Sequence, residues 1–429
     1  MNRPKVGFVG MTHLGLVSAT AVCAKGFPVL CYDPDRELIG KLGHGSLPVV
    51  EPGLPELLAA NGSRQVFSAN LDAIAACDVV YIAPDVPTDD KGQSDLTGIR
   101  RLIDATAQSL GPDAIMVILC QVPPGFTRAL AVLTPERLYY QVETLVFGRA
   151  VERATQPERY IVGCAAPDRP IDRGLAAVLG AYGCPILPMR YESAELAKIS
   201  INMCLVASIA VANTLAELCE NIGADWSEIV PALKLDQRIG PYSYLAPGLG
   251  IAGGNLERDL ATVERLAAEH CTDASIVRAW IENSRHRRDW AAKTIRGVLL
   301  AAKPEATIGV WGLAYKENTH SIKNSPSLAT IAQLNGPKIR AHDPSVPEAA
   351  LSGLILERVD DPMKAIQQAD ALMILTPWPQ YRELSPATIA AAMSGRIVID
   401  PYGILNRAKA SAAGLVHYTL GRSVAGDRL

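Results

Sequence analysis

Residues 6–15 read VGFVGMTHLG, an apolar run typical of a buried strand followed by a glycine-containing turn. Residues 16–25 then have a helical pattern, and a second apolar run, Val29–Tyr32, ends at Asp33. Strand, glycine turn, helix, strand and acid in this order are typical of the dinucleotide-binding unit of α/β proteins. The chain is therefore predicted to begin with a parallel α/β sheet.

Each part of this turn has a role in binding a dinucleotide. Gly10 would form the tight first turn, and Gly15 would let the helix pack closely against the strand. The pyrophosphate would lie at the helix N-terminus, where free amides and the helix dipole favour an anion. Asp33 would accept hydrogen bonds from a ribose diol, which favours NAD over NADP. The competing interpretation is the same strand–turn–helix without a cofactor.

The middle position of the turn departs from the usual glycine, because Thr12 stands there. Either the side chain of Thr12 pushes the phosphates outward, or its hydroxyl bonds one of them. The cofactor contacts predicted from this unit are Gly10, Thr12, His13, Leu14, Gly15 and Asp33.

The composition limits the classes of function. With 429 residues, 49% of them hydrophobic and 5% aromatic, the chain suits a large α/β protein of two or three domains. Its net charge of −3 gives no reason to expect nucleic acid or an anionic membrane as a partner. The nine cysteines lack zinc spacing and C-x-x-C pairs, so we expect no metal site and reduced thiols in a cytoplasmic protein. We expect no secretory signal and no apolar run long enough to span a bilayer.

A second glycine-rich stretch lies in the middle of the chain. Residues 236–240 read DQRIG, and residues 247–259 read PGLGIAGGNLERD. A loop so rich in glycine bends sharply and lets backbone amides approach a ligand. We therefore expect a binding loop here.

This loop resembles the substrate loop of the UDP-glucose/GDP-mannose dehydrogenase family. That loop runs Asp-x-Arg-Ile-Gly, then Pro-Gly-x-Gly-x-Gly-Gly-x-Cys, and closes with Lys-Asp. The resemblance extends in colinear order over nearly the whole chain, with further strong parts at Lys198 and Asn202 and at residues 312–326. It implies an NAD-dependent enzyme that acts on a sugar nucleotide or nucleoside.

The resemblance also implies the architecture: two Rossmann-like, doubly wound α/β domains joined by a long central helix and a helical dimerisation domain. We expect an NAD-binding domain at 1–190, a central helical dimerisation domain at 191–300 and a C-terminal Rossmann-like substrate-binding domain at 301–429. No glycine or proline interrupts the helical pattern from 191 to 222, and such a long apolar helix is typical of a homodimer core. Shorter helices are expected at 259–269 and 273–293.

By resemblance, the catalytic groups are polar residues around this helix. Lys198 and Asn202 are four residues apart, so they share one helix face and could donate to a developing oxyanion. Asp259 is a candidate base or water-orienting group, and Glu143 a second carboxylate. Further predicted cofactor contacts are Pro84, Gln121 and Lys316. Predicted substrate contacts are Arg238, which would reach the neighbouring subunit's site, Tyr244, Gly250, Gly253 and Lys323.

The chain departs from the family at its covalent nucleophile, a cysteine. The matching residue is Asn255, or Leu256 with a different gap, and no cysteine lies between Cys219 and Cys271. Arginine and glutamate positions near Glu143 have also become apolar, which suggests an altered substrate.

In the family the cysteine traps an aldehyde intermediate and carries it through a second oxidation to the acid. The amide of Asn255 is neither basic nor ionisable at neutral pH, so it cannot replace the thiolate. Two chemistries remain: a single two-electron oxidation, or a redox-neutral dehydratase or epimerase reaction in which the hydride returns to the sugar. A catalytically inactive nucleotide-binding homologue is the third alternative.

Overall fold

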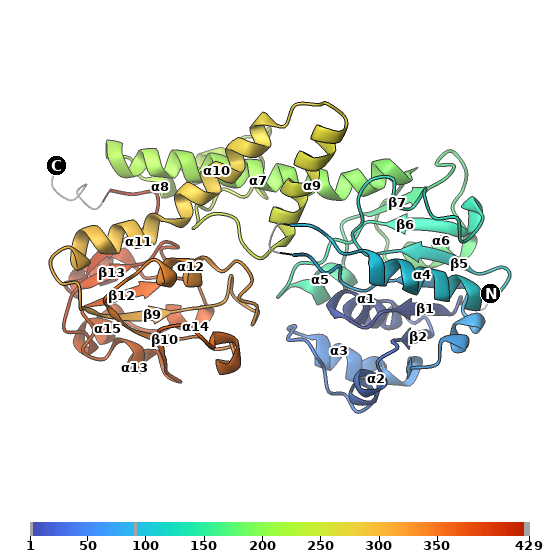
Figure 1. The fold of residues 1–429 in the computed structure, drawn as a ribbon, viewed down its shortest axis with the longest axis horizontal. Helices are drawn as coiled ribbons and strands as arrows, with labels where there is room; N and C mark the ends of the chain where they lie inside the picture. Colours follow the sequence, from blue (N-terminus) through green and yellow to red (C-terminus); the bar gives the residue numbers. More distant parts are fainter. Residues whose placement is uncertain (1–2, 90–91, 424–429) are drawn as a thin grey trace. The chain divides into compact units, whose positions relative to one another are not determined.

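The computed structural model describes residues 3–89 and 92–423 (Figure 1). The chain divides into two compact units, residues 1–201 and 202–429. Each unit is built around one sheet, and the two are described separately.

The N-terminal unit contains an eight-stranded sheet in the order β3-β2-β1-β4-β5-β6-β7-β8. Neighbouring strands are parallel except β6 and β7, which are antiparallel. The strands are β1 (Val6–Val9), β2 (Val29–Tyr32), β3 (Gln65–Ser68), β4 (Val79–Ile82), β5 (Ile115–Ile118), β6 (Leu138–Gln141), β7 (Tyr160–Cys164) and β8 (Ile186–Arg190). The α-helices are α1 (His13–Ala24), α2 (Arg36–Gly43), α3 (Leu54–Asn61), α4 (Thr97–Ser109), α5 (Ala150–Thr155) and α6 (Arg173–Gly180). Short 3₁₀ helices are η1 (Gly62–Arg64), η2 (Leu71–Ala76) and η3 (Pro135–Arg137).

The central strands of this sheet are continuous apolar runs because both of their faces are covered. All residues of β1, β2, β4 and β5 are buried. Val6 of β1 pairs with Val29 on one side and with Val79 on the other. The strand order therefore reverses between β1 and β4, which places the ligand crevice of such a sheet at the carboxyl ends of these two strands.

The C-terminal unit contains a six-stranded sheet in the order β11-β10-β9-β12-β13-β14, with all neighbours parallel. Its strands are β9 (Thr307–Trp311), β10 (Lys338–His342), β11 (Glu357–Arg358), β12 (Ala371–Ile374), β13 (Ile397–Ile399) and β14 (Val416–Tyr418). Numbered from β9, this is the Rossmann order 3-2-1-4-5-6, and the first six strands of the other sheet follow it too. The predicted fold class, two Rossmann-like α/β domains with a long central helix, is confirmed.

Helices fill the rest of the C-terminal unit. Those before the sheet are α8 (Trp226–Leu235), α9 (Asn255–Glu269), α10 (Ser275–Arg288), α11 (Trp290–Ile295) and the π-helix η4 (Arg296–Leu300). Those within the sheet domain are α12 (Pro326–Ala332), the 3₁₀ helix η5 (Glu348–Leu351), α13 (Pro362–Ile366), α14 (Pro379–Arg382), α15 (Pro386–Ala392) and α16 (Arg407–Ala412).

The helix expected at 259–269 begins four residues earlier than predicted. Gly254 stands at its N-cap with φ 90°, a left-handed conformation that lets α9 start at Asn255 directly after the glycine loop. Asp259 consequently lies in the second turn of the helix and is buried. The segment expected as one helix at 273–293 is divided at Asp289 into α10 and α11.

The long helix α7 spans Tyr191–Ile222, the range predicted from the sequence. Ile199, Val206 and Ala210 of this helix are buried, whereas Leu196 is exposed. By length and mean hydropathy this helix could also cross a membrane, so the expectation that no apolar run is long enough was wrong. One such helix is weak evidence for a membrane protein, because core helices pass the same test.

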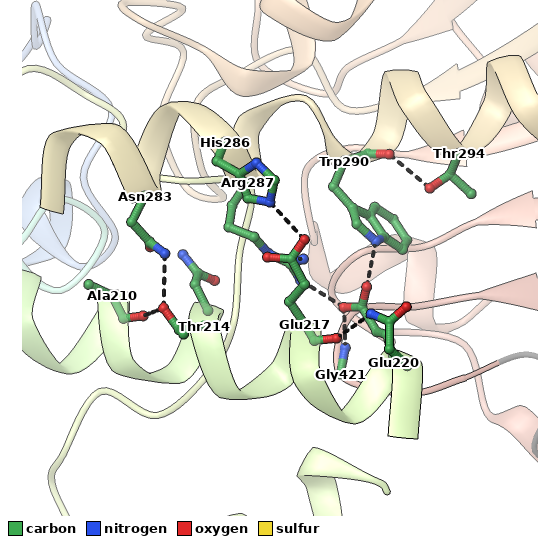
Figure 2. Close-up of polar contacts among 12 residues, drawn as sticks. Ala210, Thr214, Glu217, Glu220, Asn283, His286, Arg287, Trp290, Thr294 and Gly421 are labelled. Atoms are coloured by element: carbon green, nitrogen blue, oxygen red, sulfur yellow. Dashed lines mark hydrogen bonds and ion pairs between the residues drawn. The ribbon is translucent and has the colours of Figure 1, made fainter. Parts of the chain in front are cut away.

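A buried ion pair fastens α7 to α10 (Figure 2). The Arg287 side chain, 1% exposed, donates through Nη2 to Glu220 Oε1 at 2.7 Å and lies 3.6 Å from Glu217 Oε2. Glu220 also accepts from Trp290 Nε1 at 3.0 Å and from the Gly421 amide at 2.9 Å. One carboxylate therefore joins α7, α10, α11 and the segment that follows β14.

A second buried carboxylate fixes the glycine turn of the N-terminal unit. Glu51 Oε2 lies 2.9 Å from His13 Nε2, and the Glu51 carboxylate also accepts from the amides of Gly148 and Ala150. Burial alone would raise the pKa of Glu51, but these bonds together lower it below its ordinary value of 4.5. The charged form of Glu51 therefore stabilises the fold.

We expect Arg287→Ala to lower the free energy of unfolding by about 3–5 kcal/mol, because it removes a buried side chain and leaves the Glu220 carboxylate, 14% exposed, without its cation. Urea denaturation followed by far-UV circular dichroism measures the change. Arg285→Ala is the matched control, since Arg285 is exposed on the same helix, and it should change stability by less than about 0.5 kcal/mol. Equal losses in the two variants would contradict the role of the ion pair.

We expect Glu51→Gln to destabilise the protein by roughly 1–3 kcal/mol at pH 7. Because the folded-state pKa of Glu51 is lowered, its contribution is present above its ordinary pKa of 4.5 and is lost as the pH falls through the folded value. The difference in free energy of unfolding between wild type and Glu51→Gln, measured by denaturation from pH 7 to pH 3, should therefore become smaller below pH 4.5. Glu56→Gln, at an exposed position, should be as stable as wild type over this pH range. If the difference between wild type and Glu51→Gln does not depend on pH, the charged form of Glu51 is not what stabilises the fold.

Candidate active site

The turn after β1 accepts only glycine at two of its positions. Gly10 has φ 95°, and a Cβ there would lie 2.9 Å from Pro84 N. A Cβ on Gly15 would lie 1.9 Å from the carbonyl oxygen of Gly10. The first turn of α1 therefore packs directly on the end of β1, which leaves its amides at the mouth of the crevice.

Asp33, at the end of β2, has acceptor capacity for a ribose. Its Oδ2 accepts from the Met11 amide at 2.7 Å and its Oδ1 from the Asp35 amide at 3.0 Å, and the residue is partly exposed. The corresponding acid of the second sheet, Asp343, is 1% exposed. It accepts from Leu313 N, Ala314 N, Ser345 N, Val346 N and Trp378 Nε1. Only the acid of the N-terminal sheet is therefore accessible to a ribose diol.

The remaining residues of the turn are held by protein contacts. Thr12, the N-cap of α1, accepts the Asp85 amide at 2.7 Å through its hydroxyl, and the Leu14 amide lies 3.4 Å from Asp85 Oδ2. The His13 side chain is buried, bonded to Glu51 and stacked on Phe147 with 4.2 Å between ring centroids. His13 thus supports the turn from within, and only its backbone is at the helix end.

These observations together fit NAD. The turn supplies a helix N-terminus for a pyrophosphate, Asp33 supplies acceptors for a ribose, and Gly10 and Gly15 allow the close approach that both need. Asp85 was not predicted, because nothing in the sequence distinguishes it from other loop acids.

Lys198 is paired with Glu143 inside the N-terminal unit. Lys198 Nζ lies 3.2 Å from Glu143 Oε2, and the two side chains are 12% and 17% exposed. Glu143 also accepts the amide of Leu145, which orients its carboxylate. The pair brings a cation and a carboxylate together at the N-terminal half of α7.

Glu195 is a site residue that the sequence analysis missed. It is fully buried on α7, and its carboxylate accepts the Gly125 amide at 2.6 Å and the Thr127 amide at 2.8 Å. Burial raises its pKa, and these bonds oppose the rise. Glu195 therefore ties the loop that carries Gln121 to the helix that carries Lys198. An acid three residues before Lys198 in an apolar helix was the available signal.

Asn202 and Asp259 form a second pair, inside the C-terminal unit. Asn202 Nδ2 donates to Asp259 Oδ2 at 2.5 Å, and Arg258 Nε lies 3.4 Å from Asp259 Oδ1. All three side chains are at least nine-tenths buried. Since its carboxylate is engaged in this way, Asp259 is suited to orienting the Asn202 amide more than to abstracting a proton.

The glycine loop before α9 is anchored at several points. The Gly248 amide donates to Asn213 Oδ1, the Ile251 amide donates to Ser284 Oγ, and the Ile251 carbonyl accepts from Arg288. A Cβ on Gly250 would lie 2.5 Å from Ser284 O, and one on Gly253 would lie 2.4 Å from the Tyr315 ring. Gly250 and Gly253 therefore have a structural reason to be glycine.

Asn255 is exposed as the first residue of α9. The cysteines that flank it are distant along the chain: Cys219 precedes it by 36 residues, and Cys271 follows it by 16. Cys204 lies two residues after Asn202 on α7, so it points to the opposite side of that helix. Burial raises the pKa of Cys120, beside Gln121, to about 12, so this thiol is not ionised at neutral pH.

The other predicted ligand contacts lie in two segments of the C-terminal unit, one before the glycine loop and one after β9. Arg238 has an 89% exposed side chain and pairs with Asp236 at 2.6 Å, and Tyr244 is 48% exposed. Lys316 and Lys323 lie in the loop between β9 and α12, in the C-terminal unit. The Lys323 side chain packs against Gly254, where an added Cβ would lie 3.3 Å from Lys323 Cε.

Comparison with known proteins identifies the family. Three models described as the UDP-glucose/GDP-mannose dehydrogenase family match the chain in order: the NAD binding domain at residues 4–173, the central domain at 192–285 and the UDP binding domain at 309–407. Together they cover most of the sequence.

Relatives match over nearly their full lengths. The UDP-glucose 6-dehydrogenase TuaD of Bacillus subtilis is 29% identical, covering 97% of this chain and 93% of the relative. The UDP-glucose 6-dehydrogenase of Pseudomonas aeruginosa is 28% identical, covering 97% of each. The solved structure of a UDP-glucose dehydrogenase from Pyrobaculum islandicum superposes with a TM-score of 0.85 at 27% identity, covering 99% of this chain and 98% of that one.

The glycine turn that fits a dinucleotide, the two Rossmann-like sheets and these matches agree. The chain belongs to the UDP-glucose/GDP-mannose dehydrogenase family and is an NAD-dependent oxidoreductase.

Proposed function

We propose that this enzyme oxidises the sugar of a nucleotide sugar in one two-electron step and lacks the cysteine-dependent second oxidation. The observation that carries the proposal is Asn255 at the start of α9, where the resembled motif has its thiol. A carboxamide forms no thiohemiacetal-like adduct, so the aldehyde is not held for a second hydride transfer.

The polar groups needed for the first oxidation are present. Bound NAD would supply the hydride acceptor for the carbon that bears the alcohol. Lys198 and Asn202, one turn apart on α7, are suited to stabilise the negative charge that develops on the sugar oxygen. Glu143 keeps the Lys198 ammonium in place, and Asp259 keeps the Asn202 amide in place.

The substrate is proposed to be a nucleotide sugar because the C-terminal sheet matches the UDP binding domain of the family. The curated relatives are named as UDP-glucose 6-dehydrogenases. The segment after Glu143 carries the apolar Val146 and Phe147, and Phe147 is stacked on His13. These apolar residues stand where the resembled motif has an arginine and a glutamate, which supports a sugar other than glucose, or one oxidised at another carbon.

A redox-neutral reaction is the second candidate, and the Lys198–Glu143 pair favours it. Glu143, with a 17% exposed side chain, would remove the proton made acidic by transient oxidation of a neighbouring carbon, and the Lys198 ammonium would stabilise the enolate-like charge that forms. Loss of a β-hydroxyl or inversion of the centre would follow, and the hydride would return, as in a dehydratase or epimerase.

We expect at most one NADH per sugar when the enzyme is incubated with NAD and a panel of UDP-sugars and GDP-mannose. The measurements are absorbance of NADH, mass spectrometry of the product and deuterium uptake from heavy water. Deuterium uptake without NADH selects the redox-neutral reaction. Asn255→Cys should gain some uronate product, whereas the matched Asn255→Ala should not. Two NADH and a uronate from the unaltered enzyme would disprove the proposal, and no reaction at all would indicate an inactive homologue.

We also propose that the enzyme is a homodimer, working in the cytoplasm, with α7 at the interface. One side of α7 carries apolar side chains at helical spacing that are 40–63% exposed: Val211, Leu215, Leu218 and Ile222. Contiguous exposed apolar side chains of this kind mark interaction surfaces. The highly exposed Arg238 side chain is consistent with a role in the neighbouring subunit.

We expect the wild type to run as a dimer in size-exclusion chromatography with light scattering, and Leu215→Arg to run as a monomer. The substitution places a charge inside the proposed interface. Ile355→Arg is the control, because Ile355 is 94% exposed in the C-terminal sheet domain. A wild-type monomer, or a dimer that tolerates Leu215→Arg, would contradict the assignment.

A further inference from the structure

The crevice at the carboxyl ends of β1 and β4 already contains an anion of the protein itself. Asp85 follows β4 by three residues, and its Oδ2 lies 3.4 Å from the Leu14 amide in the first turn of α1. This amide belongs to the helix N-terminus on which a dinucleotide places its pyrophosphate. The side chain of Asp85 thus lies where a phosphate oxygen is expected.

The position of Asp85 is set by its backbone. The Asp85 amide donates to the Thr12 hydroxyl oxygen at 2.7 Å, and the preceding Pro84 packs against Gly10 so closely that a Cβ on Gly10 would lie 2.9 Å from it. Both contacts hold the segment after β4 over the helix end. The Thr12 hydroxyl therefore bonds the Asp85 segment, a role that differs from both of those considered for Thr12 from the sequence.

Two anions cannot share one helix end without a cost. Unit charges about 4 Å apart repel even in a water-like medium, and the repulsion grows as the site is shielded from solvent. The other acid of the crevice, Asp33, does not create this conflict, because it lies at the end of β2, where it would accept hydrogen bonds from a ribose diol.

We infer that Asp85 sets the affinity of the cofactor site: its carboxylate occupies the pyrophosphate position and lowers the affinity for NAD. Binding of the dinucleotide moves this carboxylate away from the Leu14 amide. The inference goes beyond the proposed function, because it concerns the affinity for NAD and holds whichever fate the hydride has.

The test is NAD binding by isothermal titration calorimetry, without sugar substrate, to wild type and Asp85→Asn. Asparagine keeps the size of the side chain and removes its charge, so the dissociation constant of NAD should fall about tenfold at low salt. The ratio between the two proteins should shrink at 0.5 M salt, because partly exposed charges are screened. Asp104→Asn, an exposed acid on α4 of the same unit, is the matched control for net charge and should leave the constant unchanged.

Two further ligands, ADP and adenosine, distinguish repulsion between Asp85 and a phosphate from a general change in the affinity of the site. ADP should gain affinity in Asp85→Asn as NAD does, while adenosine, which has no phosphate, should not. Unchanged or weaker NAD binding in Asp85→Asn, or an equal gain for adenosine, would overturn the inference. A thermal melt of each variant establishes that the comparison is between folded proteins, and Asp85→Ser, which also removes the charge, should give the same direction.

Discussion

Both sheets of this enzyme depend on one steric constraint, the close approach of the segments that follow their first and fourth strands. In the N-terminal sheet the approach is between Gly10 and Pro84, and in the C-terminal sheet a Cβ on Gly312 would lie 2.3 Å from Thr376 Cβ. Both glycines have φ near 95°. This close approach leaves no room for a side chain on the residue that directly follows the first strand of each sheet.

The two crevices differ in how their acids are used. Asp343 is saturated by five protein donors and serves to shape its loop, whereas Asp33 accepts two amides and remains partly exposed. The same strand–turn–helix topology therefore supports a dinucleotide site in one unit and a different kind of loop in the other. The family models, an NAD binding domain and a UDP binding domain, agree with this division.

The elements that sequence reasoning found are those whose cause is local. The turn at Gly10 and the helix at Tyr191–Ile222 follow from glycine placement and from an unbroken apolar period. The contacts it missed join residues far apart in the chain: Asp85 to Leu14 across 71 residues, Glu195 to Gly125 across 70 and Arg287 to Glu220 across 67. The start of α9 was misplaced because the left-handed conformation of Gly254 is set by the loop as a whole. These residues are brought together by tertiary packing, which cannot be derived from a single sequence.

The contacts of the Glu220 carboxylate bear on the order in which parts of the chain can fold during translation. Its bond to the Gly421 amide spans 201 residues, and the Trp226 amide likewise donates to the carbonyl of Gly421. On the ribosome, the end of α7 therefore emerges long before the residue that completes its polar partners is synthesised. The N-terminal sheet has all of its strands within the first 190 residues and is able to fold during translation. The central helices, in contrast, acquire their final contacts only when the segment after β14 has been released.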